Sequence, residues 1–327
     1  MAKPGCVAVA CCYVRAHVRA FLYVALGLGA LLIGFAAASP AKVSPVPVAA
    51  ASSSALVQGV YGNCSLASNG DACIGRLRRI AAGGFKVVLN YAVFDASRAQ
   101  LQRYMNAAAA LGIKLIWPMK DSPWWGPGSL AGAYPKLAAS CGCADNGAFA
   151  RYVVGLVKSS PSTWAYYLAD EQPSNNAPQI TAFSRWLHAL DPSHPRLAIA
   201  VGDDNVAQLL SPYASAADVL GADSYPVGTG QPVSRVGVIA GDVGAVAAAT
   251  HRQTAMVLQA FDWADYPNAG PWPAPRWPTR WEMRTMRDLA IRNAHPSLIL
   301  WYSYFDIRRA PNASQRWRDL VWAAFGH

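Results

Sequence analysis

From Leu56 onward, short β-rich runs alternate with longer helical runs along the whole chain. The β-rich runs are Leu56–Gly62, Lys86–Tyr91, Lys114–Met119, Thr163–Ala169, Arg196–Val201, Val219–Tyr225, Ala255–Phe261 and Leu298–Tyr304. Strands that alternate with helices are typical of parallel β/α units. Eight units across residues 56–326 average about 34 residues each, near the ~31 per unit of a 250-residue barrel. The alternation therefore predicts a single-domain (β/α)8 TIM barrel of the α/β class.

The helical runs between these strands carry their own start and stop signals. The clearest of them are Ser97–Leu111, Ala148–Lys158, Ala177–Leu190, Thr279–Asn293 and Pro311–Phe325. Gly112 stands where a C-terminal capping glycine belongs, and Thr279 with Glu282 forms a capping box. A doubly wound sheet is disfavoured because the segment Gly59–Cys64 is not a phosphate-binding turn.

The N-terminal segment has the pattern of an export signal. Lys3, Arg15 and Arg19 precede an uninterrupted apolar run from Ala20 to Ala38, which ends in small residues. This order is that of a secretory signal peptide. At 19 residues the run is also just long enough to span a bilayer as an uncleaved anchor. We therefore expect a signal peptide or signal anchor over residues 1–38, a flexible linker over 39–54 and the barrel over 55–327.

The charge of the chain argues against a nucleic-acid partner. The net charge is +10, but residues 1–38 hold three basic residues and no acidic one, so the remainder carries +7. Those charges are scattered and form no basic stripe. The composition, 53% hydrophobic and 14% charged, excludes a disordered chain. We expect an exported monomer that is secreted, periplasmic or in the cell envelope, contacting a membrane only through an uncleaved N-terminal segment.

Four cysteines follow the N-terminal segment, and an even number in an exported chain indicates disulfides. They are Cys64, Cys73, Cys141 and Cys143. Pairing Cys64 with Cys73 closes a short loop and is the favoured arrangement. Cys141 and Cys143 would then close a tight ring, so a crossed pairing between the two loops stays open. No His lies near the four, which disfavours a zinc site.

In a barrel of this kind the active site lies at the carboxyl ends of the strands. The candidate residues there are Asn90, Tyr91, Trp117, Lys120, Asp170, Glu171, Asp223, Tyr225, Gln259, Asp262, Trp263, Trp301, Tyr302 and Tyr304. Aromatic rings stack on the apolar faces of sugar rings, while carboxylates and amides hydrogen-bond to sugar hydroxyls. This mixture at one end of the barrel predicts a carbohydrate-binding cleft.

Three segments resemble clan A glycoside hydrolases. Tyr167–Pro173 resembles the acid/base motif at the end of the fourth strand, in which Glu follows Asn or Asp. Val219–Pro226 resembles the D-x-Y-P end of the sixth strand. Pro278–Met286, followed by Leu300–Tyr304, is similar to the last β/α unit of poorly characterised hydrolase-like barrels. The resemblance covers most of residues 56–326 and implies an exported glycosidase that acts on a poly- or oligosaccharide through carboxyl-based acid/base catalysis.

Glycoside cleavage needs two carboxyl groups across the scissile bond. The resemblance implies that Glu171 is the acid/base, with a raised pKa; its alternative role is a helix N-terminal carboxylate. Asp170 precedes it, so strand alternation predicts that the two side chains leave on opposite sides. Asp170 either holds a sugar hydroxyl or forms a structural ion pair in the barrel mouth.

The second carboxyl is where the chain departs from the clan pattern. The resemblance implies a Glu at the end of the seventh strand, but Gln259 stands there and cannot act as a nucleophile. Three outcomes stay open. Asp262 serves from a shifted position, or Asp223 serves with Tyr225 beside it, or the barrel binds glycans without cleaving them. Asp306 is a further candidate that reads equally well as an ion-pair partner.

The strand-end aromatic residues have two interpretations. Trp117, Trp263, Trp301, Tyr302 and Tyr304 either stack on sugars or belong to the core. No H-E-x-x-H, P-loop or dinucleotide fingerprint occurs, so we expect neither a metal nor a cofactor.

Overall fold

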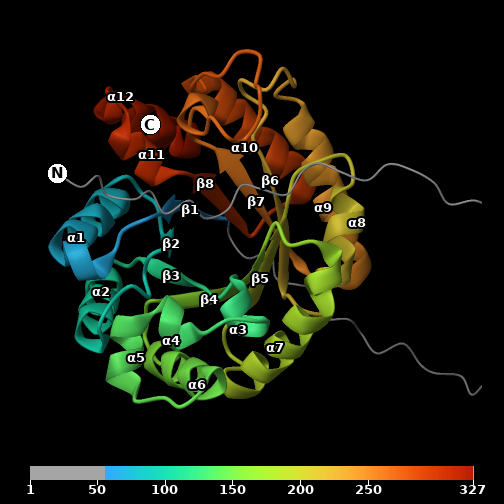
Figure 1. Cartoon of the computed structure of the whole chain (residues 1–327). Helices are drawn as coiled ribbons and strands as arrows, with labels where there is room; N and C mark the ends of the chain where they lie inside the picture. Colours follow the sequence, from blue (N-terminus) through green and yellow to red (C-terminus); the bar gives the residue numbers. More distant parts are fainter. Residues whose placement is uncertain (1–55, 327) are drawn as a thin grey trace, which may run out of the picture. The chain divides into compact units, whose positions relative to one another are not determined.

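The computed structural model describes residues 56–326, which form a closed eight-stranded barrel (Figure 1). Each strand pairs in parallel with the next, and β8 pairs with β1 to close the ring. The predicted (β/α)8 barrel is therefore confirmed. The predicted signal segment and linker lie outside the described residues. In the part of the chain that is described, no helix is long and apolar enough to cross a membrane.

All eight predicted strands are present, with ends that differ by one or two residues. They are β1 Val57–Gly62, β2 Val87–Asn90, β3 Lys114–Pro118, β4 Thr163–Asp170, β5 Arg196–Ala200, β6 Val219–Ser224, β7 Gln253–Gln259 and β8 Leu298–Tyr302. The largest difference is at β7, which begins and ends two residues earlier than predicted. The β8 strand ends before Ser303 because a short helix begins at Tyr304.

The helices form a ring around the barrel (Figure 1). The long ones are α1 Leu66–Ala82, α2 Arg98–Ala110, α6 Asn146–Val157, α7 Ala177–Leu190, α9 Arg235–Thr250, α10 Arg280–Ala294 and α12 Ala313–Phe325. The short ones are α3 Ser122–Trp125, α4 Leu130–Ala133, α5 Pro135–Cys141, α8 Val206–Leu210 and α11 Tyr304–Arg309. Short 3₁₀ turns lie at η1 Ser174–Asn176, η2 Ser211–Tyr213 and η3 Trp263–Asp265.

The two faces of the strands bury two separate apolar layers. One layer fills the barrel and includes Tyr61, Leu89, Tyr167 and Leu300. The other lies between the strands and the helices, and holds residues such as Tyr166. Neighbouring residues of a strand point to opposite faces, which is why Tyr166 and Tyr167 belong to different layers. Burial on both faces explains the low charged fraction of the chain.

Residues from the two ends of the barrel sequence meet at the contact between β1 and β8. Val57 pairs with Leu298 in the register of the sheet. The side-chain amide of Gln58 donates to the carbonyl of Ala324 at 2.6 Å and accepts from the Trp301 indole at 3.0 Å. These bonds span 266 and 243 residues of sequence.

The cysteine pairing agrees with the favoured prediction. Cys64 and Cys73 form a disulfide whose Cα atoms lie 5.8 Å apart. Cys141 and Cys143 pair with each other, so the crossed alternative does not occur. The first disulfide ties the loop after β1 to α1.

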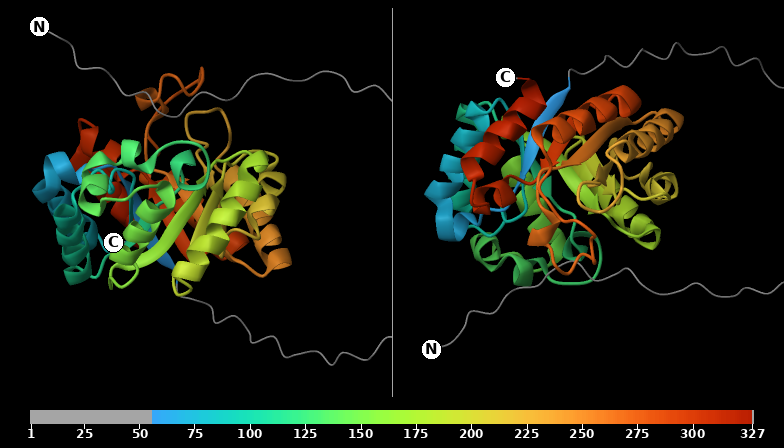
Figure 2. Two further views of the ribbon diagram at one scale, coloured as in Figure 1. Left: turned by 60° about the horizontal axis from the view of Figure 1, so that its bottom comes forward. Right: turned by 90° about the horizontal axis from the view of Figure 1, so that it is seen from above.

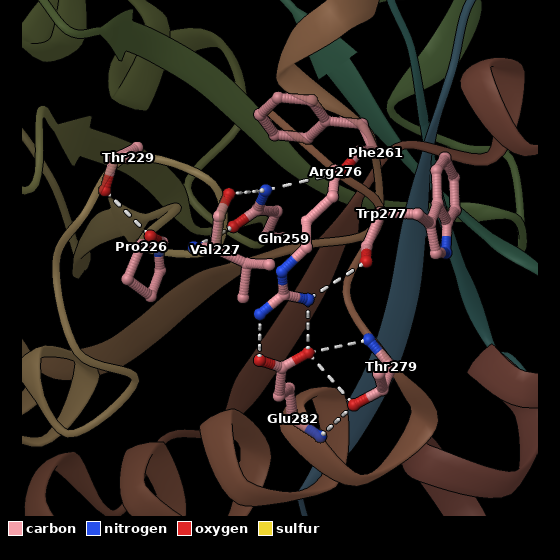
Figure 3. Close-up of polar contacts among 9 residues, drawn as sticks. All are labelled: Pro226, Val227, Thr229, Gln259, Phe261, Arg276, Trp277, Thr279 and Glu282. Carbon is pink, nitrogen blue, oxygen red and sulfur yellow. Dashed lines mark hydrogen bonds and ion pairs between the residues drawn. The ribbon is translucent and has the colours of Figure 1, made fainter. Parts of the chain in front are cut away.

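The predicted capping box at the start of α10 is present. The Thr279 hydroxyl accepts from the Glu282 amide at 3.2 Å, and the Glu282 carboxylate accepts from the Thr279 amide at 2.9 Å. Arg276 makes a two-pronged ion pair with the same carboxylate (Figure 3). These contacts fix the end of the long connection between β7 and α10.

Replacing Thr279 by Ala is expected to lower the free energy of unfolding by about 1 kcal/mol, because the cap of α10 loses its acceptor. The measurement is a urea unfolding curve at neutral pH. Thr285→Ala, at an exposed position inside the same helix, is the matched control and should change stability little. An equal loss in both variants would contradict a capping role.

Candidate active site

The carboxyl ends of the strands meet at one mouth of the barrel. Asp170 ends β4 and Glu171 follows it, Asp223 lies at the end of β6, and Lys120 follows β3. The connection over residues 260–279, between β7 and α10, projects beyond the helices (orange in Figure 2). It carries several aromatic rings over the mouth. The mouth therefore combines carboxyl groups from the ends of β4 and β6 with aromatic rings from several other segments.

Asp170 is held by three donors. Its carboxylate accepts from the hydroxyls of Tyr167 at 2.5 Å and Tyr91 at 3.0 Å, and pairs with the Lys120 ammonium at 3.1 Å. Lys120 also pairs with Asp121 at 3.2 Å. Burial alone would lower the pKa of Lys120, but the charges of Asp170 and Asp121 outweigh it and raise that pKa. Lys120 is therefore charged and Asp170 is fixed in the mouth.

Glu171 adopts a left-handed backbone conformation, with φ of 51°. Its amide still pairs with the Ile199 carbonyl of β5 at 2.9 Å. Non-glycine residues rarely occupy this region. Because Glu171 leaves the extended conformation, the alternation of side chains along β4 stops at this residue. Asp170 contacts Tyr91 and Tyr167 in the mouth, and Glu171 contacts Asp223 there, so both carboxyls face the mouth. The expectation that they leave the strand on opposite sides was wrong.

Asp223 is buried, while Glu171 is exposed, and the two carboxyls share a hydrogen bond. Burial raises the pKa of Asp223 well above its ordinary value, and the neighbouring Glu171 raises it further through charge and hydrogen bonding. The Gly202 amide donates to Asp223 at 2.7 Å and partly opposes this shift. Asp223 is therefore a carboxyl of the mouth whose pKa is raised.

Aromatic rings line the other side of the mouth. Tyr302 lies within 5.2–5.8 Å, centroid to centroid, of Tyr61, Tyr225 and Phe261. Trp263 packs edge-on against Phe261 at 4.9 Å. Burial raises the pKa values of Tyr61 and Tyr225 well above the usual range, so their hydroxyls keep their protons. The wall thus offers apolar faces and phenolic donors together.

Four of the predicted sugar-binding residues lie away from this cleft. Trp117 and Trp301 are fully buried between strands and helices, and their indoles donate to Thr163 and Gln58. Tyr304 is buried because it starts α11 and packs against Trp317. Asn90 is buried and its amide bonds twice to the backbone of Cys64. Their side chains point to the helical layer or a loop.

Gln259 is also fully buried, and its side-chain amide forms hydrogen bonds with backbone groups instead of facing the cleft. It accepts from the Val227 amide at 2.8 Å and donates to the Val227 carbonyl at 2.9 Å (Figure 3). A further bond reaches the Phe261 carbonyl at 3.3 Å. Asp262 caps η3 by accepting from the Ala264 amide at 2.9 Å. Neither residue pairs with Glu171 in the described structure.

Asp306 is buried below the aromatic wall. Its carboxylate accepts from the Tyr266 hydroxyl at 2.7 Å and pairs with Arg309. Ser303 donates to the same carboxylate. The carboxylate is therefore fully partnered, in agreement with its ion-pair interpretation.

Sequence reasoning missed several residues of the mouth: Tyr61, Tyr167, Gly202, Phe261 and Tyr266. The available signal for Tyr167 was its place at the start of the Tyr167–Pro173 motif, three residues before Asp170. Gly202 carries no side chain and is recognisable only from the Asp223 contact. Residues 56–326 contain no group of three or more potential metal ligands.

The closed parallel barrel is a (β/α)8 TIM barrel, and its fold is similar to that of solved glycoside hydrolase structures. Similar solved structures include the endo-β-1,4-mannanase from Thermotoga petrophila, at 12% identity and a TM-score of 0.53, with 83% of this chain and 77% of that one covered. A putative α-L-fucosidase from Bacteroides thetaiotaomicron has the same two values, with 86% and 99% covered.

A β-galactosidase from Halorubrum lacusprofundi reaches a TM-score of 0.57 at 12% identity, with 82% of this chain and 57% of that one covered. At these identities the likeness establishes the fold. No protein-family model and no curated protein matches the sequence.

Proposed function

We propose that this protein is a glycoside hydrolase in which Glu171 and Asp223 are the two reacting carboxyl groups. The observation that carries the proposal is their contact in the mouth, one exposed and one buried, sharing a hydrogen bond. Two carboxyls this close cannot both ionise easily, so the pair keeps one proton over the middle pH range. Such a pair contains one acid and one base.

The chemistry follows from that shared proton. One carboxyl protonates the glycosidic oxygen, while the ionised one activates a water molecule or attacks the anomeric carbon. Retaining glycosidases separate these groups by about 5–5.5 Å, which exceeds a hydrogen-bond contact. Glu171, which is exposed, must therefore turn away from Asp223 when a sugar enters. The Gly202 amide holds Asp223 in place meanwhile.

The proposed substrate is a poly- or oligosaccharide. The rings of Tyr225, Trp263 and Tyr302 supply faces for sugars, and Tyr91, Lys120 and Asp170 supply polar groups. The glycosidase-like fold supports this substrate class. No cofactor is part of the proposed mechanism.

We also propose that residues 1–38 export the barrel, on the strength of the basic segment and the apolar run. Fractionation of the producing cells, with N-terminal sequencing of the exported form, tests this. Detection of the intact chain in the cytoplasm alone would contradict it.

The second candidate function is glycan binding without cleavage. It is favoured by Gln259, since the end of β7 has an amide bound to backbone where the clan pattern has a carboxylate. A panel of polysaccharides, read for both binding and reducing-end release by the full-length protein, separates the two functions. Binding without release supports the second.

Asp223→Asn tests the carboxyl pair. We expect turnover to fall by at least about 10²-fold, because the variant has lost one of the two carboxyls. The same change should stabilise the fold at neutral pH, since Asn can still accept from Gly202 and removes a buried group with a raised pKa. The contribution of Asp223 to the stability of the fold is fully present below the pKa of this residue in the unfolded chain, near 4. It is lost as the pH rises through the higher pKa of the folded state.

The readouts are reducing-end release and the melting temperature between pH 4 and pH 8. The melting temperature of the variant should exceed that of the wild type by about 2–4 °C for each kcal/mol gained in the free energy of unfolding. This difference should increase with pH. Asp204→Asn, at an exposed position in the loop after β5, is the matched control. Unchanged turnover in Asp223→Asn would remove this residue from the mechanism.

A further inference from the structure

A second candidate binding site lies on the outside of the barrel. A groove of about 490 Å³ is bordered by α1, α10 and α12. Its principal lining residues are Arg79, Gly83, Arg280, Trp317, Arg318 and Trp322. None of these residues contributes to the mouth described above. The groove is therefore separate from the Glu171 and Asp223 pair.

Indole rings and guanidinium groups stack along the edge of this groove. Trp281 is 61% exposed, which is unusual for so large an apolar side chain. Its ring meets that of Trp322 edge-on at 4.5 Å. The Arg280 guanidinium lies 5.5 Å from the Trp281 ring and 5.0 Å from the Trp322 ring. Arg284 approaches Trp322 from 5.7 Å. These cation–π contacts hold the guanidinium groups of Arg280 and Arg284 beside the indole rings.

The groove also carries more positive than negative charge, with three arginines and one aspartate in its lining. Arg79, Arg280 and Arg318 are exposed, and among residues 56–326 none of them has an acidic partner in an ion pair. The one acidic lining residue, Asp319, accepts from the Gln315 amide at 2.8 Å. Arginine forks match carboxylate groups in a bidentate geometry. The surface thus complements an anion that also offers a flat apolar face.

We propose that this groove binds a carboxylated polysaccharide. A uronic-acid chain presents both required features, because each sugar ring has an apolar face and a carboxylate. The groove is concave, which suits a chain better than a flat lipid surface. It would hold an acidic glycan near the barrel independently of cleavage, so the proposal does not require Glu171 to be catalytic.

The test is affinity electrophoresis of the full-length protein in gels containing polygalacturonate or alginate, with amylose as the neutral comparison. Trp281→Ala and the double variant Arg280→Ala/Arg318→Ala should each weaken retention on the acidic polymers by about tenfold. The matched control is Arg78→Ala/Arg185→Ala, which removes the same charge at exposed positions outside the groove lining. It should change retention less than twofold.

Several outcomes would overturn the proposal. They are equal losses in the groove and control variants, equally strong retention on amylose, or no retention of the wild type on either acidic polymer. Sedimentation with phosphatidylglycerol vesicles tests a lipid surface instead. If only vesicle binding depends on Trp281 and Arg280, the groove is a lipid site and the proposal fails. Retention of Glu171→Gln on polygalacturonate should equal that of wild type, which separates this site from the mouth.

Discussion

Glu171→Gln is expected to lower turnover on a cleaved polysaccharide by about 10²–10⁴-fold, the usual contribution of a positioned acid/base. The amide has nearly the same shape as the carboxyl but can neither deliver nor accept the reacting proton. Glu171 is exposed, so the fold should lose no stability. Its charge raises the pKa of Asp223, and its removal should bring that pKa closer to the ordinary range.

The measurement is kcat across pH 4 to pH 9, together with the melting temperature. Asp204→Asn serves again as control, since it removes an equal charge from a neighbouring loop. A variant that turns over at the wild-type rate would show that Glu171 is structural. Loss of turnover together with loss of the folded state would point to a structural role as well.

Gly202→Ala is expected to damage both the site and the fold. A Cβ at this position would lie 1.7 Å from the Asp223 carbonyl oxygen, which no side-chain rotation relieves, because that oxygen belongs to the backbone. The end of β6 and the loop after β5 must separate, and the 2.7 Å bond to Asp223 is then lost. Overpacking of this kind costs about 1–3 kcal/mol.

Urea unfolding should show this loss, and turnover should fall even at temperatures where the variant is folded. Gly155→Ala is the matched control, because a Cβ there meets nothing within 4 Å on the exposed side of α6. Alanine is preferred in a helix interior, so this control should be neutral or slightly stabilising. A Gly202→Ala protein with wild-type stability would contradict the close approach.

The barrel could be predicted because the alternation of elements is a property of local sequence. All eight strands and the capping box at Thr279 depend on neighbouring residues. The side-chain directions at the strand ends could not be predicted in the same way. The side chain of Glu171 lies on the side opposite to the predicted one because its backbone is left-handed, and the residue types around it do not predict this conformation.

The strand-end aromatic residues show the same difficulty. Trp301 and Tyr302 are adjacent, yet one is buried under helices and the other lines the mouth. Shifting the strand by one residue would exchange the side chains on its two faces. The register of β8 therefore determines which of the two rings can contact a ligand in the mouth. Gln259 posed a different problem, since its backbone partners at Val227 come from another connection. The pairing of Glu171 with Asp223 likewise depends on how β4 and β6 are placed by the closed ring.

The contact between β1 and β8 has a consequence for how the chain folds. Its hydrogen bonds join residues more than 240 positions apart, so the ring cannot shut until the last strand has been made. Long loops are slow to close, which makes closure a late step. Until then β1 lacks its partner along one edge. Late closure is compatible with the export that we propose for this protein, because an incompletely folded chain can cross a narrow secretion channel before the barrel closes.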